Sequence, residues 1–122
     1  MFDPIGSPPT CVEVVVTAQD ADWLAAFTRS VVEDGLVASG QTDAPVKVLS
    51  MKGGEARDET RARVALHTRH TLVSDIVERV ERDSPDAVPC VVVTRLIDGS
   101  TDYLQWIVHQ TAGAQHGAGA RR

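Results

Sequence analysis

The sequence predicts one α+β domain whose elements follow the order β-α-β-β-α-β, with a short helix after the last strand. Three observations predict this order. Apolar runs rich in valine mark the strands, two amphipathic segments with helical spacing separate them, and a Gly-Gly turn joins the two central strands. This is the split β-α-β, or ferredoxin-like, pattern: one antiparallel sheet with both main helices on one face.

The first strand and the first helix are predicted within residues 11–35. Residues 11–17 (CVEVVVT) are nearly continuous in apolar character, as expected of a strand covered on both faces. Asp20 is a suitable helix N-cap, because its carboxylate can accept from the free N–H groups of the first turn. Gly35 can end the helix in a left-handed conformation, and the apolar stripe before it comprises Trp23, Leu24, Phe27 and Val31.

Residues 36–68 predict two strands and a hairpin. Residues 46–51 alternate in character, and residues 52–55 (KGGE) are a turn signal. Alternation then resumes over residues 61–67. One face of this later strand carries Ala62, Val64 and Leu66, and the other carries Arg61, Arg63 and His67.

The second half predicts a helix from about Thr71 to Asp83, ended by Ser84-Pro85, and a last long strand from Val88 to Ile97. A short helix follows the Asp98-Gly99-Ser100 turn. The predicted organisation is a loose arm over residues 1–10, a folded domain over residues 11–111, and a disordered Gly/Ala-rich tail over residues 112–122.

Composition excludes several classes of protein. The 122 residues carry a formal net charge of −5, whereas a nucleic-acid-binding protein usually has a basic face. No apolar run approaches the roughly 20 residues that span a bilayer. The first residues lack the basic and apolar segments of a signal peptide. We therefore expect a cytoplasmic protein without nucleic-acid or membrane partners.

The chain has two cysteines, Cys11 and Cys90. Both begin apolar strands, so we expect both to be small buried side chains. In the predicted topology the two strands are antiparallel neighbours, which places the cysteines roughly 20 Å apart at opposite ends. A disulfide needs Cα atoms within about 7 Å, so none is expected.

Four segments resemble the CutA family of divalent-ion tolerance proteins. Residues 98–106 (DGSTDYLQW) resemble its closing G-N-x-x-Y-L-x-W, and residues 32–39 (VEDGLVAS) resemble its V-E-x-x-L-A-A-C. Residues 84–89 (SPDAVP) stand where the family has H-P-Y-E-V-P. The K-T … L-V that opens its second helix is matched at Thr68, Leu72 and Val73. The resemblance spans roughly residues 12–108.

This resemblance implies a ferredoxin-like protomer with a long hairpin between the second and third strands, assembled as a tight homotrimer. It also implies a non-enzymatic protein that responds to, or gives tolerance of, divalent metals such as copper. The trimer is physically reasonable, because an open four-stranded sheet has exposed edges and one uncovered face that subunit pairing can cover.

Departures from the family pattern concern the metal. The family cysteine is Ser39 here, the histidine of H-P-Y-E is Ser84, and the lysine that closes the third strand is His67. Copper prefers thiolate, thioether and imidazole ligands. Metal binding is therefore expected to be weakened, and the identity of the metal ligands stays open.

Basic side chains on the later central strand are candidates to line a cleft between subunits. Such a cleft would bind an anionic metabolite, in the manner of a PII-like sensor. The alternative, which we favour, is a solvated face or a set of salt bridges to Glu55, Asp58 or Glu59. The candidate residues are Arg61, Arg63, His67, Lys52, Tyr103 and Trp106.

The histidines, the aromatic residues of the last helix and the catalytic motifs are considered in turn for metal binding or catalysis. His67 and His70 could share a metal, but exposed or hydrogen-bonded histidines are the favoured expectation, and Tyr103 and Trp106 are expected to be packing residues. No Gly-rich phosphate loop, G-x-S-x-G elbow or H-E-x-x-H motif is present. We expect no enzyme; a small dimeric monooxygenase of the same fold class is the enzymatic alternative.

Overall fold

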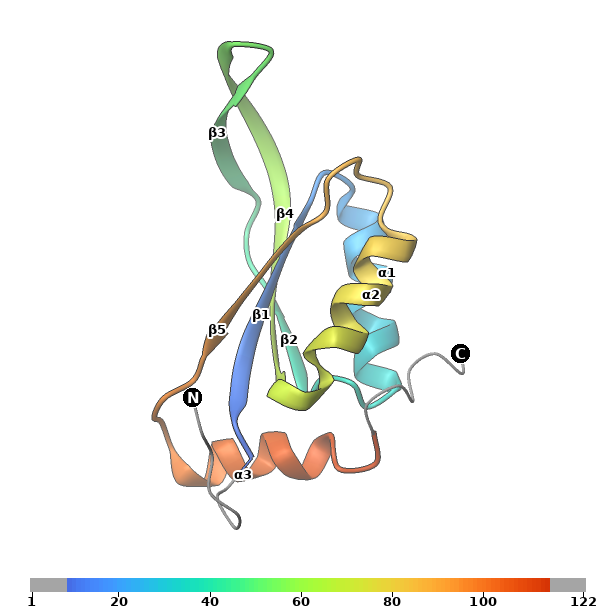
Figure 1. The fold of residues 1–122 in the computed structure, drawn as a ribbon, viewed down its shortest axis with the longest axis vertical. Coiled ribbons are helices and arrows are strands. Elements are labelled where there is room, and N and C mark those ends of the chain that lie inside the picture. Colours follow the sequence, from blue (N-terminus) through green and yellow to red (C-terminus); the bar gives the residue numbers. More distant parts are fainter. Residues whose placement is uncertain (1–8, 115–122) are drawn as a thin grey trace.

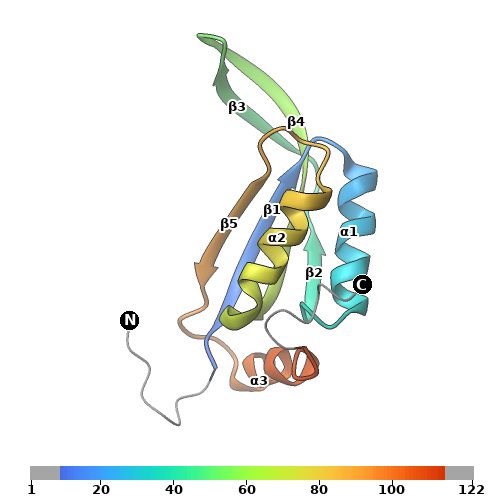
Figure 2. The ribbon, with the colours of Figure 1, turned by 45° about the vertical axis from the view of Figure 1, so that its right-hand side comes forward.

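The computed structural model describes residues 9–114, which form one antiparallel sheet with helices on one face and across one end (Figures 1 and 2). The predicted fold class is confirmed, and the strand predicted over residues 46–51 is β3. A short strand that was not predicted, β2, precedes it. The elements are β1 (Cys11–Ala18), α1 (Ala21–Glu33), β2 (Ser39–Thr42), β3 (Val46–Lys52), β4 (Glu55–Arg69), a 3-10 turn (His70–Leu72), α2 (Val73–Asp83), β5 (Cys90–Arg95) and α3 (Thr101–Gln110).

The sheet runs in the order β2-β4-β1-β5, and β3 also pairs with β4. β4 is long enough to pair with β2 and β1 at one end and with β3 at the other. The β3–β4 hairpin therefore extends beyond the body of the domain (Figure 1). Gly53 and Gly54 have φ of 58° and 82°, a conformation that two-residue hairpin turns require and that glycine adopts without steric cost.

The core lies between the sheet and the first two helices. In β1, Val12, Val14 and Val16 alternate with less buried residues, so one face of the strand packs inward. α1 and α2 lie side by side over this face (Figure 2). Their buried apolar side chains are Leu24, Phe27 and Val31 in α1, and Ile76 and Val80 in α2, beside Leu72.

The ends of α1 match the prediction. The Asp20 carboxylate accepts a 3.0 Å hydrogen bond from the Trp23 backbone N–H, and Gly35 leaves the helix with φ of 73°. The predicted second helix differs slightly. Its first turn is a 3-10 turn, and α2 proper begins at Val73 without a side-chain cap.

α3 crosses one end of the sheet (Figure 2). Ser100 caps its first turn, and Ile107 is fully buried. Arg69, the last residue of β4, donates hydrogen bonds to the carbonyl oxygens of Thr111 at 2.6 Å and Ala114 at 2.8 Å. These contacts fix the C-terminal end of α3 against the end of β4.

The last strand corrects two expectations. β5 covers Cys90–Arg95 rather than residues 88–97, and Cys90 is exposed, whereas Cys11 is buried as predicted. The reason is that β5 lies at the edge of the sheet and has β1 as its partner there. Cys90 is opposite Thr17, at the far end of β1 from Cys11, and both thiols are free, as predicted.

The predicted arm and tail lie largely outside the described residues. Of residues 1–10 the structure describes Pro9 and Thr10, and of residues 112–122 it describes 112–114. None of the helices within residues 9–114 combines the length and the apolar character that crossing a membrane requires.

Candidate functional site

A cluster of polar side chains lies on the face of the sheet that α1 and α2 leave open. His67 on β4 is opposite Glu13 on β1 and Ser39 on β2 in the sheet register. Residues directly opposite in antiparallel strands project from the same face. Tyr103 approaches them from α3. We call Glu13, Ser39, His67 and Tyr103 the His67 cluster.

Hydrogen bonds connect the His67 cluster into a chain. His67 Nε2 lies 2.9 Å from Glu13 Oε1, and His67 Nδ1 lies 2.6 Å from the Tyr103 hydroxyl. The Tyr103 hydroxyl is also 3.4 Å from Ser39 Oγ. An ionised carboxylate can only accept, so Nε2 carries the proton when His67 is neutral, and Nδ1 then accepts from Tyr103.

The cluster is partly buried and is braced by aromatic contacts. The His67 side chain is 11% exposed and that of Glu13 is 34% exposed, so solvent reaches the pair mainly from the Glu13 side. The Tyr103 ring stacks on Trp106 with centroids 5.6 Å apart and meets His67 edge-on at 5.7 Å. These contacts hold the imidazole in one orientation.

The cationic side chains of the predicted cleft, Lys52, Arg61 and Arg63, form ion pairs with carboxylates of the same chain. Arg61 lies 3.0 Å from Glu59 and 3.8 Å from Asp86, and Lys52 lies 2.9 Å from the same Glu59. Arg63 forms a 2.6 Å ion pair with Asp43. Hydrogen bonds from Lys52, and then from Arg61, hold the pKa of the Glu59 carboxyl below its ordinary value.

The structure therefore divides the predicted cleft in two. Lys52 and Arg61 lie in the β3–β4 hairpin, and Arg63 lies two residues further along β4, opposite Thr17 of β1. Their partners are acidic side chains of the same chain. His67, Tyr103 and Trp106 lie together at the α3 end. Arg61 and His67 are six positions apart along an extended strand, or roughly 20 Å.

The other histidines do not join the cluster. His70 lies in the exposed 3-10 turn and lines a shallow groove along α2, and His109 lies on the exposed side of α3. The predicted alternative of a hydrogen-bonded His67 is confirmed. His116 lies outside the described residues. Within residues 9–114, no three His, Cys, Asp or Glu side chains are grouped as metal ligands.

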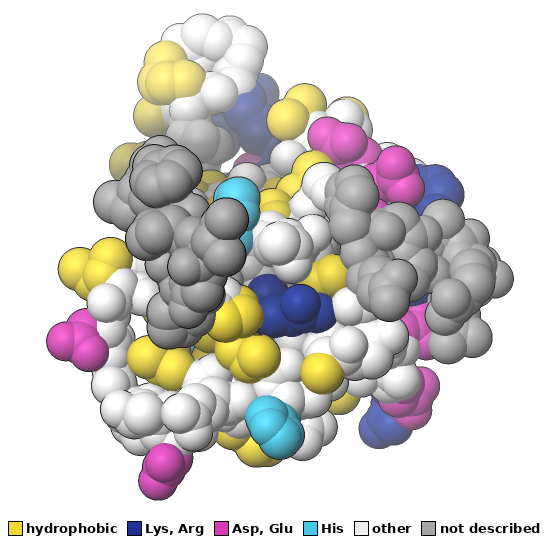
Figure 3. All heavy atoms as spheres, turned by 60° about the horizontal axis from the view of Figure 1, so that its bottom comes forward, with side chains coloured by type: hydrophobic (Ala, Val, Ile, Leu, Met, Phe, Trp, Pro, Cys, Tyr) yellow, Lys and Arg dark blue, Asp and Glu magenta, His cyan; other side chains and the backbone are white. Residues whose placement is uncertain are grey.

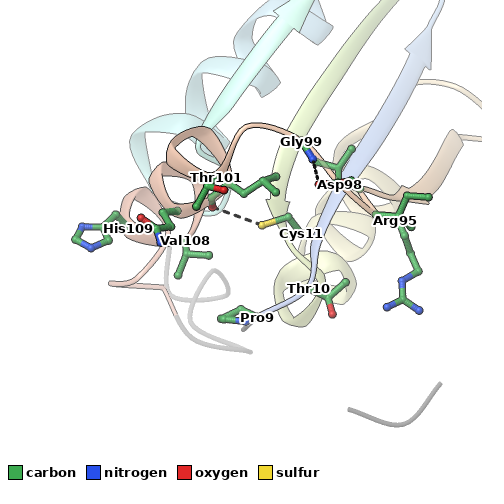
Figure 4. A pocket seen from close by; sticks show the side chains of 13 residues that line it. Pro9, Thr10, Cys11, Arg95, Asp98, Gly99, Thr101, Val108 and His109 are labelled. Atoms are coloured by element: carbon green, nitrogen blue, oxygen red, sulfur yellow. Dashed lines mark hydrogen bonds between the residues drawn. The ribbon is translucent and has the colours of Figure 1, made fainter. Parts of the chain in front are cut away.

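A cavity of about 1180 Å³ lies between the start of β1, the β5–α3 connection and α3. Figure 3 looks onto this end of the molecule, where hydrophobic side chains are exposed and acidic ones lie towards the margin. In Figure 4 the Cys11 thiol points towards α3 and His109 lies at the outer margin. Burial raises the pKa of the Cys11 thiol, against a smaller opposing effect of Arg69, so the thiol is a poor metal ligand or nucleophile.

Sequence analysis did not single out Glu13 or Asp43, although each pairs with a predicted site residue. The sequence does give a signal at Glu13, because it is the one charged residue in β1. It gives none at Asp43, which lies in a connection whose course depends on tertiary packing.

A family model described as "CutA1 divalent ion tolerance protein" matches residues 12–110, close to the span of the resemblance. No curated protein matches the chain in sequence.

Solved structures share the fold. CutA1 from the psychrotrophic bacterium Shewanella sp. SIB1 is 24% identical, with a TM-score of 0.80 over 86% of this chain and 98% of its own. CutA1 from Oryza sativa is 19% identical, with a TM-score of 0.80 over 84% of this chain and 94% of its own. A protein from Archaeoglobus fulgidus, described as a periplasmic divalent cation tolerance protein, is 18% identical, with a TM-score of 0.78 over 83% and 98%.

Proposed function

Because this chain belongs to the CutA1 divalent ion tolerance family, we propose that it is a non-enzymatic homotrimer that acts in the response to, or tolerance of, divalent metal ions. Copper is the metal we propose, and the cytoplasm the compartment. The observation that carries the proposal is the family match over residues 12–110, on a fold that the CutA1 structures share. The Archaeoglobus fulgidus relative is described as periplasmic, so the compartment needs its own measurement.

The residues at two positions of the family pattern predict weaker copper binding than that pattern would give. Ser39 and Ser84 replace the cysteine and histidine of the family pattern, and a serine hydroxyl is a poorer copper ligand than a thiolate or an imidazole. The His67 cluster supplies one imidazole and one carboxylate at a distance of 2.9 Å.

The homotrimer is supported by the surfaces that one chain leaves uncovered. Above the His67 cluster the open face of the sheet carries Val15, Ala65 and Val92, which are opposite each other in the register. Val92 is exposed, as are Leu49 and Met51 on the projecting hairpin. β5 and β2 are edge strands with free backbone groups. Pairing with further copies would cover these apolar side chains and edges.

A PII-like sensor of an anionic metabolite is less well supported. Such a site needs cationic side chains that are available to the ligand, whereas Lys52, Arg61 and Arg63 each pair with a carboxylate of the same chain. Binding an anion there would first have to displace those carboxylates, which costs free energy.

Light scattering behind size exclusion tests the assembly. Three chains of 13.1 kDa weigh about 39.3 kDa, and that mass is the expected result. A monomer or a dimer would overturn the trimer and would revive the enzymatic alternative.

Metal titration and growth test the role. We expect the protein to bind Cu²⁺ in calorimetry, and a strain without it to grow less well in elevated copper. The absence of both effects would overturn the proposed function. Nucleotide and inorganic phosphate titrations serve as the comparison, and an increase in melting temperature with either would favour the anion sensor.

A further inference from the structure

We propose that the His67 cluster is a hydrogen-bonded latch, and not a metal site, that closes α3 over the cavity at the start of β1. This inference goes beyond the proposed function, because it gives the cluster a conformational role and places any bound copper outside it. The latch is the 2.6 Å hydrogen bond between the Tyr103 hydroxyl on α3 and His67 Nδ1 on β4. Glu13 on β1 completes it by holding the other ring nitrogen at 2.9 Å.

The geometry of the cluster does not fit the divalent ion that the family implies. His67 Nε2 and Glu13 Oε1 point at each other across an ordinary hydrogen bond, and Tyr103 occupies the other ring nitrogen. An ion would have to displace one of these bonds, and it would then find one imidazole and one carboxylate. A protein site for such an ion has three or four ligands, and no three His, Cys, Asp or Glu side chains are grouped within residues 9–114.

The bonds of His67 instead join α3 to the sheet. His67 and Arg69 are two residues apart on β4, so their side chains project from the same face. His67 holds Tyr103 in the first turn of α3. Arg69 holds the carbonyl oxygens of Thr111 and Ala114, beyond the last turn. β4 therefore fastens α3 at both of its ends.

α3 depends on these polar contacts because it buries little apolar surface. Ile107 is its one buried residue, whereas α1 buries Leu24, Phe27 and Val31. Elements with few buried apolar contacts are those that open locally while the rest of a domain stays folded. We therefore expect α3 to open more often when the latch is removed.

Closed in this way, α3 covers Cys11. Cys11 is 5% exposed, and its thiol points towards α3, with Sγ 3.8 Å from the Leu104 carbonyl oxygen (Figure 4). Leu104 and Val108 of the same helix line the cavity beside it. Opening of α3 would expose the thiol, so the rate at which Cys11 reacts measures the population of the open state.

The test measures this rate in the full chain carrying Cys90→Ser, in which Cys11 is the only thiol. Tyr103→Phe removes the hydroxyl and keeps the ring that stacks on Trp106. Gln110→Ala, at an exposed position of the same helix, is the matched control. Arg69 is left unchanged, because burial raises the pKa of the Cys11 thiol and the Arg69 charge opposes that rise.

We expect iodoacetamide to modify Cys11 at least about 5-fold faster in Tyr103→Phe than in Gln110→Ala, since the net stabilisation of one hydrogen bond is lost. Amide hydrogen exchange should accelerate by a similar factor in α3 and stay unchanged in α1 and β1. An unchanged thiol rate would overturn the latch. So would an equal acceleration of exchange in every element, because the hydroxyl would then stabilise the domain as a whole.

Copper titration distinguishes the latch from a metal site. Glu13→Gln keeps an acceptor for His67 Nε2, and so keeps the latch, but removes the charged ligand that a Cu²⁺ ion would need. We expect the same Cu²⁺ affinity and the same electron paramagnetic resonance spectrum with and without this change, both in Cys90→Ser. A fall in affinity of about 10-fold or more would overturn the latch as a metal-free cluster. No Cu²⁺ uptake by either protein would overturn the proposed function and agree with the latch.

Discussion

Arg79 Nη2 on α2 lies 2.6 Å from Oδ2 of Asp34, the C-cap residue of α1. This ion pair joins the two helices that cover the core. Both side chains are largely buried, at 7% exposure for Arg79 and 19% for Asp34. The guanidinium also lies near the carbonyl end of α1, where the helix dipole favours a positive charge.

Replacing Arg79 with alanine should lower the free energy of unfolding by about 3 kcal/mol, because a buried carboxylate then loses its counter-charge. Urea denaturation monitored by Trp fluorescence measures the effect. Arg29→Ala is the control: its pair with Glu33 is exposed, so its loss should cost less than about 0.5 kcal/mol. Equal losses in the two variants would contradict the structural role of the buried pair.

Gly40 on β2 should not tolerate a side chain. A Cβ atom there would lie 2.5 Å from Thr28 Cγ2 on α1 and 3.3 Å from Leu66 Cδ2. Gly40→Ala should therefore destabilise the domain by about 1–3 kcal/mol. Adding Thr28→Ser removes the clashing methyl group but keeps the hydroxyl that donates to the Leu24 carbonyl. Part of the lost melting temperature should return in this double variant, and a failure to recover any would refute the packing explanation.

Ser39→Cys should strengthen copper binding. The new thiol would lie opposite His67 and beside Tyr103, so it adds a soft ligand to the His67 cluster. We expect an increase of at least about 10-fold in Cu²⁺ affinity by calorimetry. Ser50→Cys, on the projecting β3, controls for a thiol placed away from the cluster. Equal gains in both variants would show that any thiol suffices.

Stability should depend on Glu59 at acid pH. Hydrogen bonds from Lys52 and Arg61 hold the pKa of the folded Glu59 below the ordinary value of 4.5. The ionised form therefore stabilises the folded state fully above about pH 4.5, and this contribution is lost as pH falls through the lower folded pKa. Urea midpoints at about pH 7 and about pH 3.5 should differ less in Glu59→Gln than in the native protein. Glu55→Gln, at an exposed position, should leave the pH dependence unchanged.

The two thiols should react at different rates. Cys90 is exposed on the edge strand, whereas Cys11 is buried and burial raises its thiol pKa, which lowers the reactive thiolate fraction. Ellman's reagent should modify one thiol per native chain quickly and the second after unfolding. Cys90→Ser should abolish the fast phase. Two slow thiols in the native protein would show that another subunit covers β5.

The sequence by itself determined the order of the main elements, the caps at Asp20 and Gly35, the Gly53-Gly54 turn and the inward face of β4. It predicted β1 to be covered on both faces, whereas only one of its faces packs inward. These features are local. They depend on side-chain periodicity and on backbone conformations that a few residues favour strongly. The family resemblance was also readable, because its segments lie in register along the chain.

Tertiary structure alone decided which polar side chains meet. The sequence placed Arg61, Arg63 and His67 on one face, but not which carboxylates would pair with each. Those partners come from other strands and connections, and their positions follow from sheet register and from α3 crossing the end of the sheet. Cys90 was predicted to be buried because its run is apolar, yet it is exposed, since edge position depends on strand order and not on local hydrophobicity.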